Sequence, residues 1–490
     1  MTIFFATNEG FLHAVNADTG QEVFSFVPEQ LLPNLDTFYT NSSQGSHPYG
    51  LDGSIVTWVE DVNSDNQIVA EDGDHVYLYV GMRRGGRNYY ALDVTDRANP
   101  VLMWTIIGGQ PGDDYEQLGQ TWSAPVRTKV NIASTVEEVL VFAGGYHPGQ
   151  DDAAVKTADA YGNAVFIVRA GPDSNENGGN EDGTPDVIWS AGDGPSFDLD
   201  LPAMDYSMPA SPKVLDMDHD GYPDQLYIGD VGGQLWRFDF SNSAVSAATY
   251  ATAGIIGSIS GIASNDARRF YHTPDVSLVN QSGYTFLNIA MGSGFHAHPL
   301  NEVIDDRFYS FRSSDVFAPP ASYVAKTESD IYDATANLLG TEGDSLTEED
   351  LAAEIAQFTA ASGWLMDLER SGEKVLANSL TVNNQVIFTT YEPNNTSGSG
   401  CTAAIGTSRV YVVSVVDGVP LLDVDEDGDK DKTDRSLTLS TSSIAPEPFA
   451  LVPETGDPII LVGPETPVED LDFGNLSVRT YWYQKMDPAD

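Results

Sequence analysis

Short runs of β-branched and aromatic residues alternate along the chain with turns rich in Gly, Asn and Asp. At the N-terminus, Ile3–Ala6, Phe11–Val15 and Glu22–Val27 are separated by two such turns. Runs of this kind, bounded by turn residues, are typical of β-strands joined into hairpins. Related units begin near His75, Val139, Lys213, Phe286, Gly363 and Ser408. The pattern therefore predicts an all-β protein built from about seven hairpin units.

The spacing of these units favours one closed architecture. Successive units lie roughly 40–75 residues apart, which suits the blades of a β-propeller separated by long insertions. Sandwich domains in series are the alternative, but no Pro/Ser-rich linker divides the chain. We therefore expect residues 1–490 to form a single β-propeller domain. Insertions are expected near residues 36–71, 173–186, 241–266, 330–361 and 423–436. Within them, Asp36–Glu71 and Ser241–Asp266 read as long loops.

One insertion departs from the strand pattern and predicts a short helix, Ser345–Ala361. Ser345 and Glu348 fit a capping box at its start. The apolar residues that recur at helical spacing are Leu351, Ile355 and Phe358. Such a stripe predicts a helix packed by one face, here on the rim of the propeller.

Acidic residues outnumber basic ones by 73 to 23 over 490 residues, which gives a formal net charge of −50. A field of this sign repels nucleic acid and anionic lipid, so we expect neither as a partner. Hydrophobic residues still make up 41% of the chain, which separates it from a disordered acidic tail. A uniformly acidic surface suits a salty medium, where counterions screen the self-repulsion.

The lone cysteine, Cys401, excludes an intrachain disulfide, although large folds and metal-bound loops need none. No apolar run approaches the length of a membrane span, so we expect no transmembrane segment. Met1 leads directly into a predicted strand, without a secretory signal peptide. We therefore expect a piece of a longer precursor whose upstream segment carries the export signal.

The most informative motif is the acidic loop Asp216–Asp224. Its carboxylates stand at positions 1, 3, 5 and 9 and Gly221 at position 6, so alternate oxygens can surround one hard cation. The predicted calcium ligands are Asp216, Asp218, Asp220, Asp224 and the carbonyl of Tyr222. Strand-like sequence follows the loop and Tyr227 occupies position 12, so the motif is no EF-hand. The alternative is a solvated acidic turn.

A second acidic loop repeats this spacing and adds an acid at position 12, which resembles the dockerin type of calcium repeat. Its carboxylates are Asp423, Asp425, Asp427, Asp429, Asp431 and Asp434. We expect a second calcium site within a hairpin insertion. The alternative is a solvated run of charge, because lysines interrupt the acids.

Two further loops repeat this spacing of oxygen-bearing side chains less completely. A third predicted calcium loop uses Asp173, Asn175, Asn177 and Glu181. Two amides replace carboxylates there, so binding is expected to be weaker, and a Gly/Asn-rich hairpin loop is the alternative. Asp61–Val69 begins in the same way but lacks a side-chain oxygen at position 9, so it is expected to be a turn.

The remaining candidates lack partners. His296 and His298 could face one side of a strand as zinc ligands, but no third ligand can be named. Cys401 has no identifiable His partner, and Tyr481–Tyr483 are expected to pack in a strand rather than to stack on a sugar. No acid–base pair, nucleophile–base arrangement or phosphate-binding Gly loop stands out, which predicts a non-enzymatic protein.

Several segments, in order along nearly the whole chain, are similar to one known family. They are Asn8–Gly20, Phe26–Pro28, Gly85–Asp96, Leu118–Pro125, Asp216–Phe240 and Cys401–Tyr411. The run Tyr-Tyr-Ala-Leu-Asp-Val-Thr-Asp in the third segment and the acidic loop in the fifth are the most specific. Together they resemble the C-terminal domain of the PilC/PilY family of type IV pilus biogenesis factors and adhesins.

The resemblance implies a modified seven-bladed β-propeller that binds Ca²⁺ and acts at the pilus base or tip in extension, retraction and surface attachment. The calcium ligands it implies are those named above for the first loop. Pilins or minor pilins and a host or abiotic surface ligand are the implied partners, and the implied location is extracellular, at the cell surface. The region similar to a von Willebrand A domain in many members has no counterpart here. No Arg-Gly-Asp occurs either, Arg84-Gly85-Gly86 being nearest, so integrin-type recognition through that tripeptide is unsupported.

Two other classes stay open at the level of sequence. Quinoprotein-like dehydrogenases have propeller repeats that end like Ala17–Gly20, but they often carry a vicinal cysteine pair, which one cysteine cannot supply. A calcium-dependent lectin propeller would hold the metal at a sugar site, and it is compatible with adhesion at a pilus.

Overall fold

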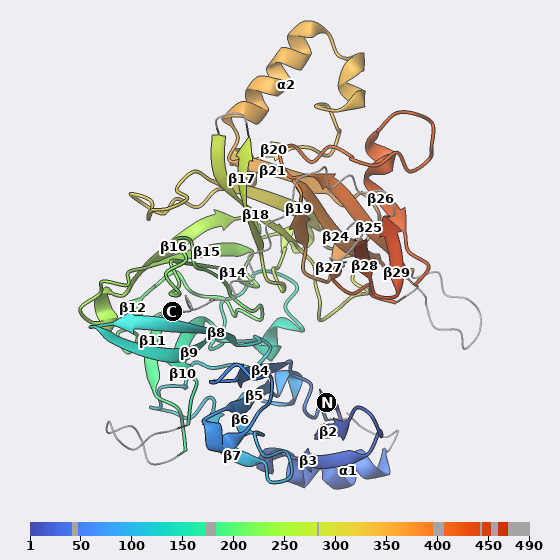
Figure 1. Cartoon of the computed structure of the whole chain (residues 1–490). Helices are drawn as coiled ribbons and strands as arrows, with labels where there is room; N and C mark the ends of the chain where they lie inside the picture. The colour runs from blue at the N-terminus through green and yellow to red at the C-terminus, as the bar shows by residue number, and fades with distance from the viewer. Residues whose placement is uncertain are drawn as a thin grey trace, which may run out of the picture.

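The computed structural model describes residues 1–41, 48–172, 183–281, 284–394, 406–441, 443–451 and 459–468. The described strands form seven sheets that follow one another along the chain (Figure 1). Neighbouring strands pair antiparallel, apart from two short parallel pairings at sheet edges. The all-β class with few helices is therefore confirmed.

The first three sheets occupy the N-terminal part of the chain. The first contains β1 (Thr2–Ala6), β2 (Leu12–Asn16) and β3 (Glu22–Phe26). The second contains β4 (Ile55–Glu60), β5 (His75–Gly81), β6 (Asn88–Asp93) and β7 (Val101–Ile107). The third contains β8 (Val126–Ile132), β9 (Thr135–Ala143), β10 (Ala164–Arg169), β11 (Val187–Gly192) and β12 (Leu199–Asp200).

Four further sheets follow. The fourth contains β13 (Lys213–Leu215), β14 (Gln225–Gly229), β15 (Gln234–Phe240) and β16 (Ala251–Ser258). The fifth contains β17 (Asp275–Gln281), β18 (Tyr284–Gly292), β19 (Arg307–Ser313), β20 (Tyr332–Asp333) and β21 (Gly363–Asp367). The sixth contains β22 (Lys374–Val375), β23 (Leu380–Val382), β24 (Gln385–Glu392), β25 (Thr407–Ser414) and β26 (Ser436–Thr438). The seventh contains β27 (Pro448–Leu451), β28 (Ile459–Val462) and β29 (Glu465–Val468).

Helices are few and short. The two α-helices of the described chain are α1 (Leu35–Thr40) and α2 (Glu348–Ala360). The 3-10 turns are η1 (Glu29–Asn34), η2 (Ala70–Asp72), η3 (Arg83–Gly85), η4 (Pro148–Gln150), η5 (Ala247–Thr249), η6 (Ser264–Asp266), η7 (Glu328–Asp330), η8 (Thr341–Ser345) and η9 (Lys432–Arg435). Among the described residues, no helix has the length and apolar character needed to cross a membrane.

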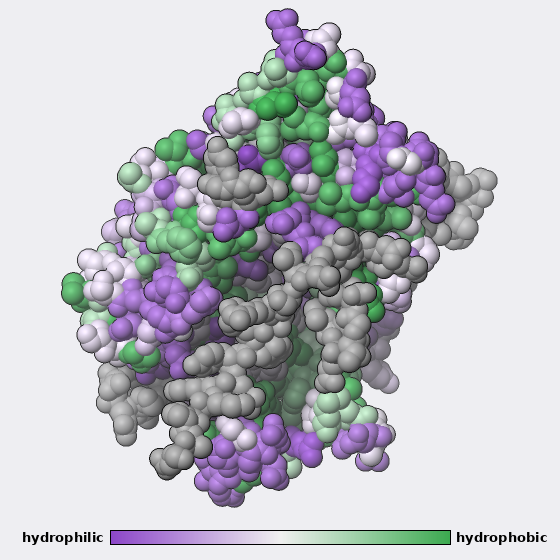
Figure 2. Space-filling view, turned by 45° about the horizontal axis from the view of Figure 1, so that its top comes forward, coloured by the Kyte–Doolittle hydropathy of each residue, from purple (hydrophilic) through white to green (hydrophobic). Residues whose placement is uncertain are grey.

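The hydrophobic core is divided among the gaps between successive sheets. Six clusters of buried residues each join one sheet to the next along the chain. In β14, Leu226 and Ile228 pack toward the third sheet while Tyr227 packs toward the fifth. A strand buried on both faces needs apolar residues at successive positions, which explains the unbroken hydrophobic runs in the sequence. The sheets therefore stack face to face in chain order, and the face shown in Figure 2 carries several hydrophilic patches.

Two segments expected to be loops contain strands, so those expectations were wrong. Asp36–Glu71 includes β4, which buries Trp58 while its neighbours Thr57 and Val59 stay exposed. Ser241–Asp266 includes β16, whose alanines and glycines have low strand propensity. The glycines are needed there because a Cβ at Gly254 would lie 2.4 Å from the side chain of Tyr323. Pairing with β15 and close packing therefore override local preference.

The predicted helix exists, but its start was misplaced. The N-cap is Thr347, whose hydroxyl accepts from the Asp350 backbone N–H at 3.2 Å. Ser345 instead ends η8 and donates its hydroxyl to the Glu342 carbonyl at 2.8 Å, so it cannot cap the helix. Of the apolar stripe, Phe358 packs edge-on against Tyr332, with ring centroids 5.6 Å apart. The helix projects from the fifth sheet at the top of Figure 1.

Candidate metal sites

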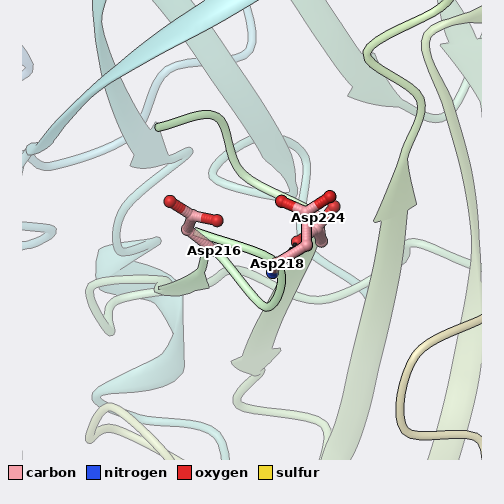
Figure 3. Close-up of side chains that lie close together, drawn as sticks. All are labelled: Asp216, Asp218 and Asp224. Carbon is pink, nitrogen blue, oxygen red and sulfur yellow. Dashed lines mark hydrogen bonds between the residues drawn. The ribbon is translucent and has the colours of Figure 1, made fainter. Parts of the chain in front are cut away.

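The first acidic loop closes a β-hairpin of the fourth sheet. β13 and β14 pair antiparallel, with Leu215 opposite Gln225. Asp216 directly follows the first strand and Asp224 directly precedes the second, so the hairpin brings the two ends of the loop together. Figure 3 shows Asp218 and Asp224 side by side, with Asp216 across the loop. Strand pairing thus positions residues eight apart in sequence within one small turn.

The backbone of this loop curls inward around its carboxylates. His219 and Gly221 adopt left-handed conformations, with φ of 63° and 90°. Backbone N–H groups then donate to side chains of the loop, from Asp220 to Asp218 at 3.1 Å and from Gly221 to Asp216 at 2.9 Å. The N–H of Tyr222 donates to Asp220 at 2.9 Å. These bonds orient the acidic side chains before any ligand is considered.

Three carboxylates converge on one point. Asp216, Asp218 and Asp224 each offer an oxygen, and these atoms all lie within 4.8 Å of one another. Burial raises the pKa of Asp224, and the negative charges of Asp218 and Asp216 raise it further. Asp220 lies beside this group, where its second oxygen accepts from the Asn242 amide at 3.3 Å. As calcium ligands, Asp216, Asp218, Asp220, Asp224 and the Tyr222 carbonyl all stay predictions.

The second acidic loop has the same design in the sixth sheet. It connects β25 to β26, which pair antiparallel, so the expected position within a hairpin is confirmed. Glu426 and Gly428 have φ of 59° and 99°, matching the two left-handed residues of the first loop. The matching hydrogen bonds run from Asp427 N to Asp425 at 3.2 Å, from Gly428 N to Asp423 at 3.1 Å and from Asp429 N to Asp427 at 3.1 Å.

The two loops differ in the acid that closes them. In the first loop, Asp224 at position 9 accepts from the backbone N–H of Met217 at 2.6 Å. In the second loop, Asp434 at position 12 accepts from the N–H of Val424, also at 2.6 Å. Asp434 is fully buried, and its oxygens lie within 4.8 Å of those of two separate pairs of acids. The pairs are Asp423 with Asp425, and Asp429 with Asp431.

Charge accumulates in the second loop as well. Slight desolvation and the nearby charges of Asp427, Asp431 and Asp434 raise the pKa of Asp429. Like charges held this close disfavour the ionised form of each. A cation among them would remove this repulsion, so both loops are electrostatically suited to a hard cation with oxygen ligands.

The strongest sign of a ligand is a pair of unsatisfied oxygens. Oδ1 of Asp216 and Oδ1 of Asp423, both at position 1, are buried and have no hydrogen-bond partner among the described residues. A buried polar atom without a partner is unfavourable, because it has lost its water. A hard cation bound at position 1 would satisfy both atoms.

The loop at Asp61 provides an internal comparison. It repeats the turn, with the N–H of Val62 donating to Asp74 at 2.8 Å. Here, however, both oxygens of Asp61 accept backbone N–H groups, from Asp65 at 3.2 Å and from Asn66 at 2.7 Å. Both oxygens at its first position are therefore already satisfied by hydrogen bonds, and the segment forms the expected turn, with Asp74 accepting from Val62.

The other sequence candidates separate into two groups. The predicted third loop, Asp173, Asn175, Asn177 and Glu181, lies outside the described residues, as do Cys401 and Tyr481–Tyr483. The two histidines do not form a zinc pair. His296 approaches the Arg83 guanidinium at 3.4 Å, whereas His298 Nε2 lies 2.7 Å from the Asp151 carbonyl oxygen.

Sequence reasoning did not anticipate that the second loop supports the helical insertion. The Lys432 N–H donates to Glu342 at 2.7 Å, and the Thr341 hydroxyl donates to the Lys430 carbonyl at 2.9 Å. Buried Arg435 donates to the Thr335 carbonyl at 2.7 Å. These residues are about 90 to 100 positions apart, and no local pattern signals such contacts.

Comparison with known proteins gives a consistent result. The family model described as the PilY1 beta-propeller domain matches residues 1–159. A type IV pilus biogenesis factor PilY1 homolog from Xylella fastidiosa is 26% identical over 423 residues, which cover 82% of this chain and 28% of the relative. Type IV pilus biogenesis factor PilY1 from Pseudomonas aeruginosa PAO1 is 29% identical over 238 residues, or 48% of this chain and 17% of the relative.

A solved structure shares the fold. The crystal structure of the Pseudomonas aeruginosa PilY1 C-terminal domain aligns with a TM-score of 0.58 at 19% identity, covering 94% of this chain and 90% of that one. The chain spans less than a third of the length of the curated relatives it matches.

Proposed function

Because the chain belongs to the PilC/PilY family, we propose that it is the calcium-binding, non-enzymatic propeller of a type IV pilus-associated adhesin and assembly factor. A pilus-associated role follows from the family. The calcium part rests on one observation, the buried and unpartnered Oδ1 at position 1 of both acidic loops. Oxygen-only donor sets of this spacing suit a hard cation such as Ca²⁺.

The residues assigned to calcium follow the geometry of each loop. Asp216, Asp218 and Asp224 form the first site, with Asp220 and the Tyr222 carbonyl as further ligands. In the second loop, Asp423, Asp425 and Asp434 are the principal ligands, with Asp427, Asp429 and Asp431 beside them. Asp173, Asn175, Asn177 and Glu181 would form a weaker third site. Bound Ca²⁺ would neutralise the carboxylates and supply the missing partner of each Oδ1.

We further propose that each of the seven sheets is one blade of a modified seven-bladed propeller. This is supported by the six buried clusters, each of which joins one sheet to the next. Blades of a propeller pack in this way around a common axis.

The two loops would control different parts of the surface. The first loop holds β13, a strand of three residues that makes few hydrogen bonds of its own. The second loop holds the segment that carries α2, through the contacts of Lys432 and Arg435. Ordering of these two regions would make attachment dependent on calcium. Pilins or minor pilins and a host or abiotic surface ligand are the proposed partners, with the protein outside the cell at the pilus.

The test places Asp216→Asn and Asp423→Asn together in the full-length protein of a piliated bacterium. Calcium-dependent surface attachment and the number of extended pili are then measured with and without a chelator. We expect the double variant to lose the response to calcium, while the matched variant Asp61→Asn keeps it. A double variant that attaches and extends pili in a fully calcium-dependent way would exclude these loops as the calcium sites.

A further inference from the structure

A cavity of about 300 Å³ lies where the connections to five sheets meet. Asp52, Arg83, Trp122, His272 and His296 are among the residues that line it. They come from segments next to β4, β5, β8, β17 and β18, so no single hairpin forms this central cavity. Its volume is at the lower end of the range for small-molecule sites. The acidic loops contribute no residue to it.

Arg83 is held in an unusual conformation at this cavity. Its φ of 51° is in the left-handed region, which is uncommon for a residue with a side chain. The guanidinium lies over the ring of Trp122, 4.4 Å from the centroid, and Nη1 donates to Asp52 at 3.2 Å. Outliers of this kind are concentrated at functional sites. The strained turn thus aims a cation at the cavity in a chain whose net charge is −50.

His296 presents an unused donor. Arg83 Nη2 lies 3.4 Å from His296 Nε2, and because a guanidinium can only donate, Nε2 must be the acceptor. Burial, together with the charges of Arg83 and Arg84, lowers the pKa of His296 to about 4, so the ring is neutral and its proton is on Nδ1. Nδ1 is buried and has no acceptor among the described residues. An N–H donor is therefore left unsatisfied.

His272 adds a second unused nitrogen. The two imidazole rings are 5.3 Å apart, and Nε2 of His272 is also buried without a partner in the described chain. Burial lowers the pKa of His272 well below its ordinary value, and His296 and Arg83 lower it further. Arg83 carries positive charge beside both imidazoles, while its Nη1 is paired with Asp52. The neighbouring Arg83 and Arg84 guanidiniums disfavour a metal cation at these imidazoles.

We propose that the central cavity binds a small carboxylate, held by the Arg83 guanidinium, the His296 Nδ1–H and His272 in its Nε2–H tautomer. A carboxylate accepts through two oxygens and matches the planar fork of a guanidinium. It would also give the buried imidazole donor its missing acceptor. Trp122 supports Arg83 from behind. The carboxylate belongs to a free small molecule or to the end of a polypeptide.

The test uses the whole chain and four probes at constant ionic strength. Succinate and acetate are the carboxylates, acetamide is the neutral analogue and chloride is the control for screening. Thermal unfolding is followed as each probe is raised to about 50 mM, because saturable binding to the folded state raises the midpoint. We expect a saturable rise with the carboxylates alone.

Four variants assign the binding to this cavity. Arg83→Gln and His296→Asn should each weaken succinate binding about tenfold or more, because each removes one donor. Arg127→Gln is the matched control. Arg127 also lies over a tryptophan, 4.3 Å from the Trp58 centroid, and pairs with Glu138 at 3.0 Å, but it is remote from the cavity. It should bind succinate like the parent. The unfolding midpoint of each variant without probe shows whether it is folded, and Arg83→Lys provides a milder change that keeps the charge.

Each remaining result has a defined meaning. Equal effects of chloride and succinate, or unchanged succinate binding in both Arg83→Gln and Arg83→Lys, would overturn the proposal. If succinate gives no response, a short peptide is tested with a free and with an amidated C-terminus. Binding of the free form alone would assign the carboxylate to the end of a polypeptide. The lack of a saturable response to every carboxylate and to that peptide would also overturn the proposal.

Discussion

Whether the Asp216→Asn variant or the parent protein is the more stable should depend on calcium. The variant should be at least as stable as the parent in chelator and less stable than the parent in calcium. An amide keeps the size of the side chain and the acceptor for the Gly221 N–H, so the turn should still form. It removes one of three charges and the carboxylate oxygen that has no partner. The variant therefore tests the ligand function of Asp216 without deleting its structural role.

The effect without calcium can be worked from the distances. Oxygens of Asp216, Asp218 and Asp224 lie within 4.8 Å of one another. Two unit charges at that distance repel by about 1 kcal/mol in water, and by about 3 kcal/mol at an effective dielectric constant near 20. Asp216 takes part in two of the three repulsive pairs. In chelator, we therefore expect Asp216→Asn to be at least as stable as the parent.

The effect with calcium is opposite in sign. Extracellular calcium modules bind with dissociation constants of about 10⁻⁴ to 10⁻³ M. At a free concentration of about 100 times that constant, one site stabilises the folded state by about 2.7 kcal/mol. For 490 residues the entropy of unfolding is about 1 kcal/mol/K, so each site should raise the midpoint by about 3 °C. Asp216→Asn should lose one such increment and the double variant with Asp423→Asn should lose both.

Thermal unfolding in calcium and in chelator measures all of these values on one preparation. Asp61→Asn is the control, because both oxygens of Asp61 are already bonded to backbone N–H groups. Its stability should fall equally in both conditions. If Asp216→Asn retained the full calcium increment, or if Asp61→Asn lost as much of it, the assignment based on the unpartnered oxygen would be wrong.

Three further predictions concern the scaffold. Thr347→Ala should destabilise α2 by about 1 kcal/mol, measured by hydrogen exchange of the helix, whereas Ser345→Ala should leave it unchanged because Ser345 is not the cap. Burial raises the pKa of Asp306 from 3.8 to about 6, so the stability that this group contributes is complete below about pH 4 and is lost as the pH rises through about 6. Asp306→Asn should therefore flatten the stability curve in that interval, measured by urea unfolding; an unchanged slope would contradict the buried, protonated acid. Arg237→Met should cost about 3–5 kcal/mol by leaving the charge of Asp239 buried and unpaired, and adding Asp239→Leu should recover part of the loss in the same assay.

Much of the architecture was predictable because its cause is local. Leu226–Ile228 are apolar at successive positions, and such runs signal strands buried on both faces. β16 escaped prediction because its glycines are selected by the space that Tyr323 leaves, which is a property of the packed structure. The helix cap was misplaced by two residues, since two capping patterns overlap in sequence and only hydrogen bonding decides between them.

The candidate sites divide in the same way. The spacing of the acidic residues can be seen in the sequence alone. It identified both acidic loops and Asp434 at position 12, which closes the second loop. Which oxygen of the first aspartate lacks a partner depends on three-dimensional hydrogen bonding, so the difference between Asp61 and Asp216 in this respect could not be predicted from the sequence. The central cavity could not be anticipated either, because Arg83 and His296 are brought together from positions 213 residues apart.

The position of both acidic loops at the tips of hairpins also affects the order in which the chain folds. With the proposed calcium sites empty, repulsion between Asp216, Asp218 and Asp224 in the turn would delay the pairing of β13 with β14. The third and fifth sheets, which pack on β14, would complete that packing only after β13 and β14 have paired. A chain of this kind would remain open in a low-calcium compartment and complete its folding after reaching a calcium-rich one. Calcium binding would then determine when during export the chain completes its folding.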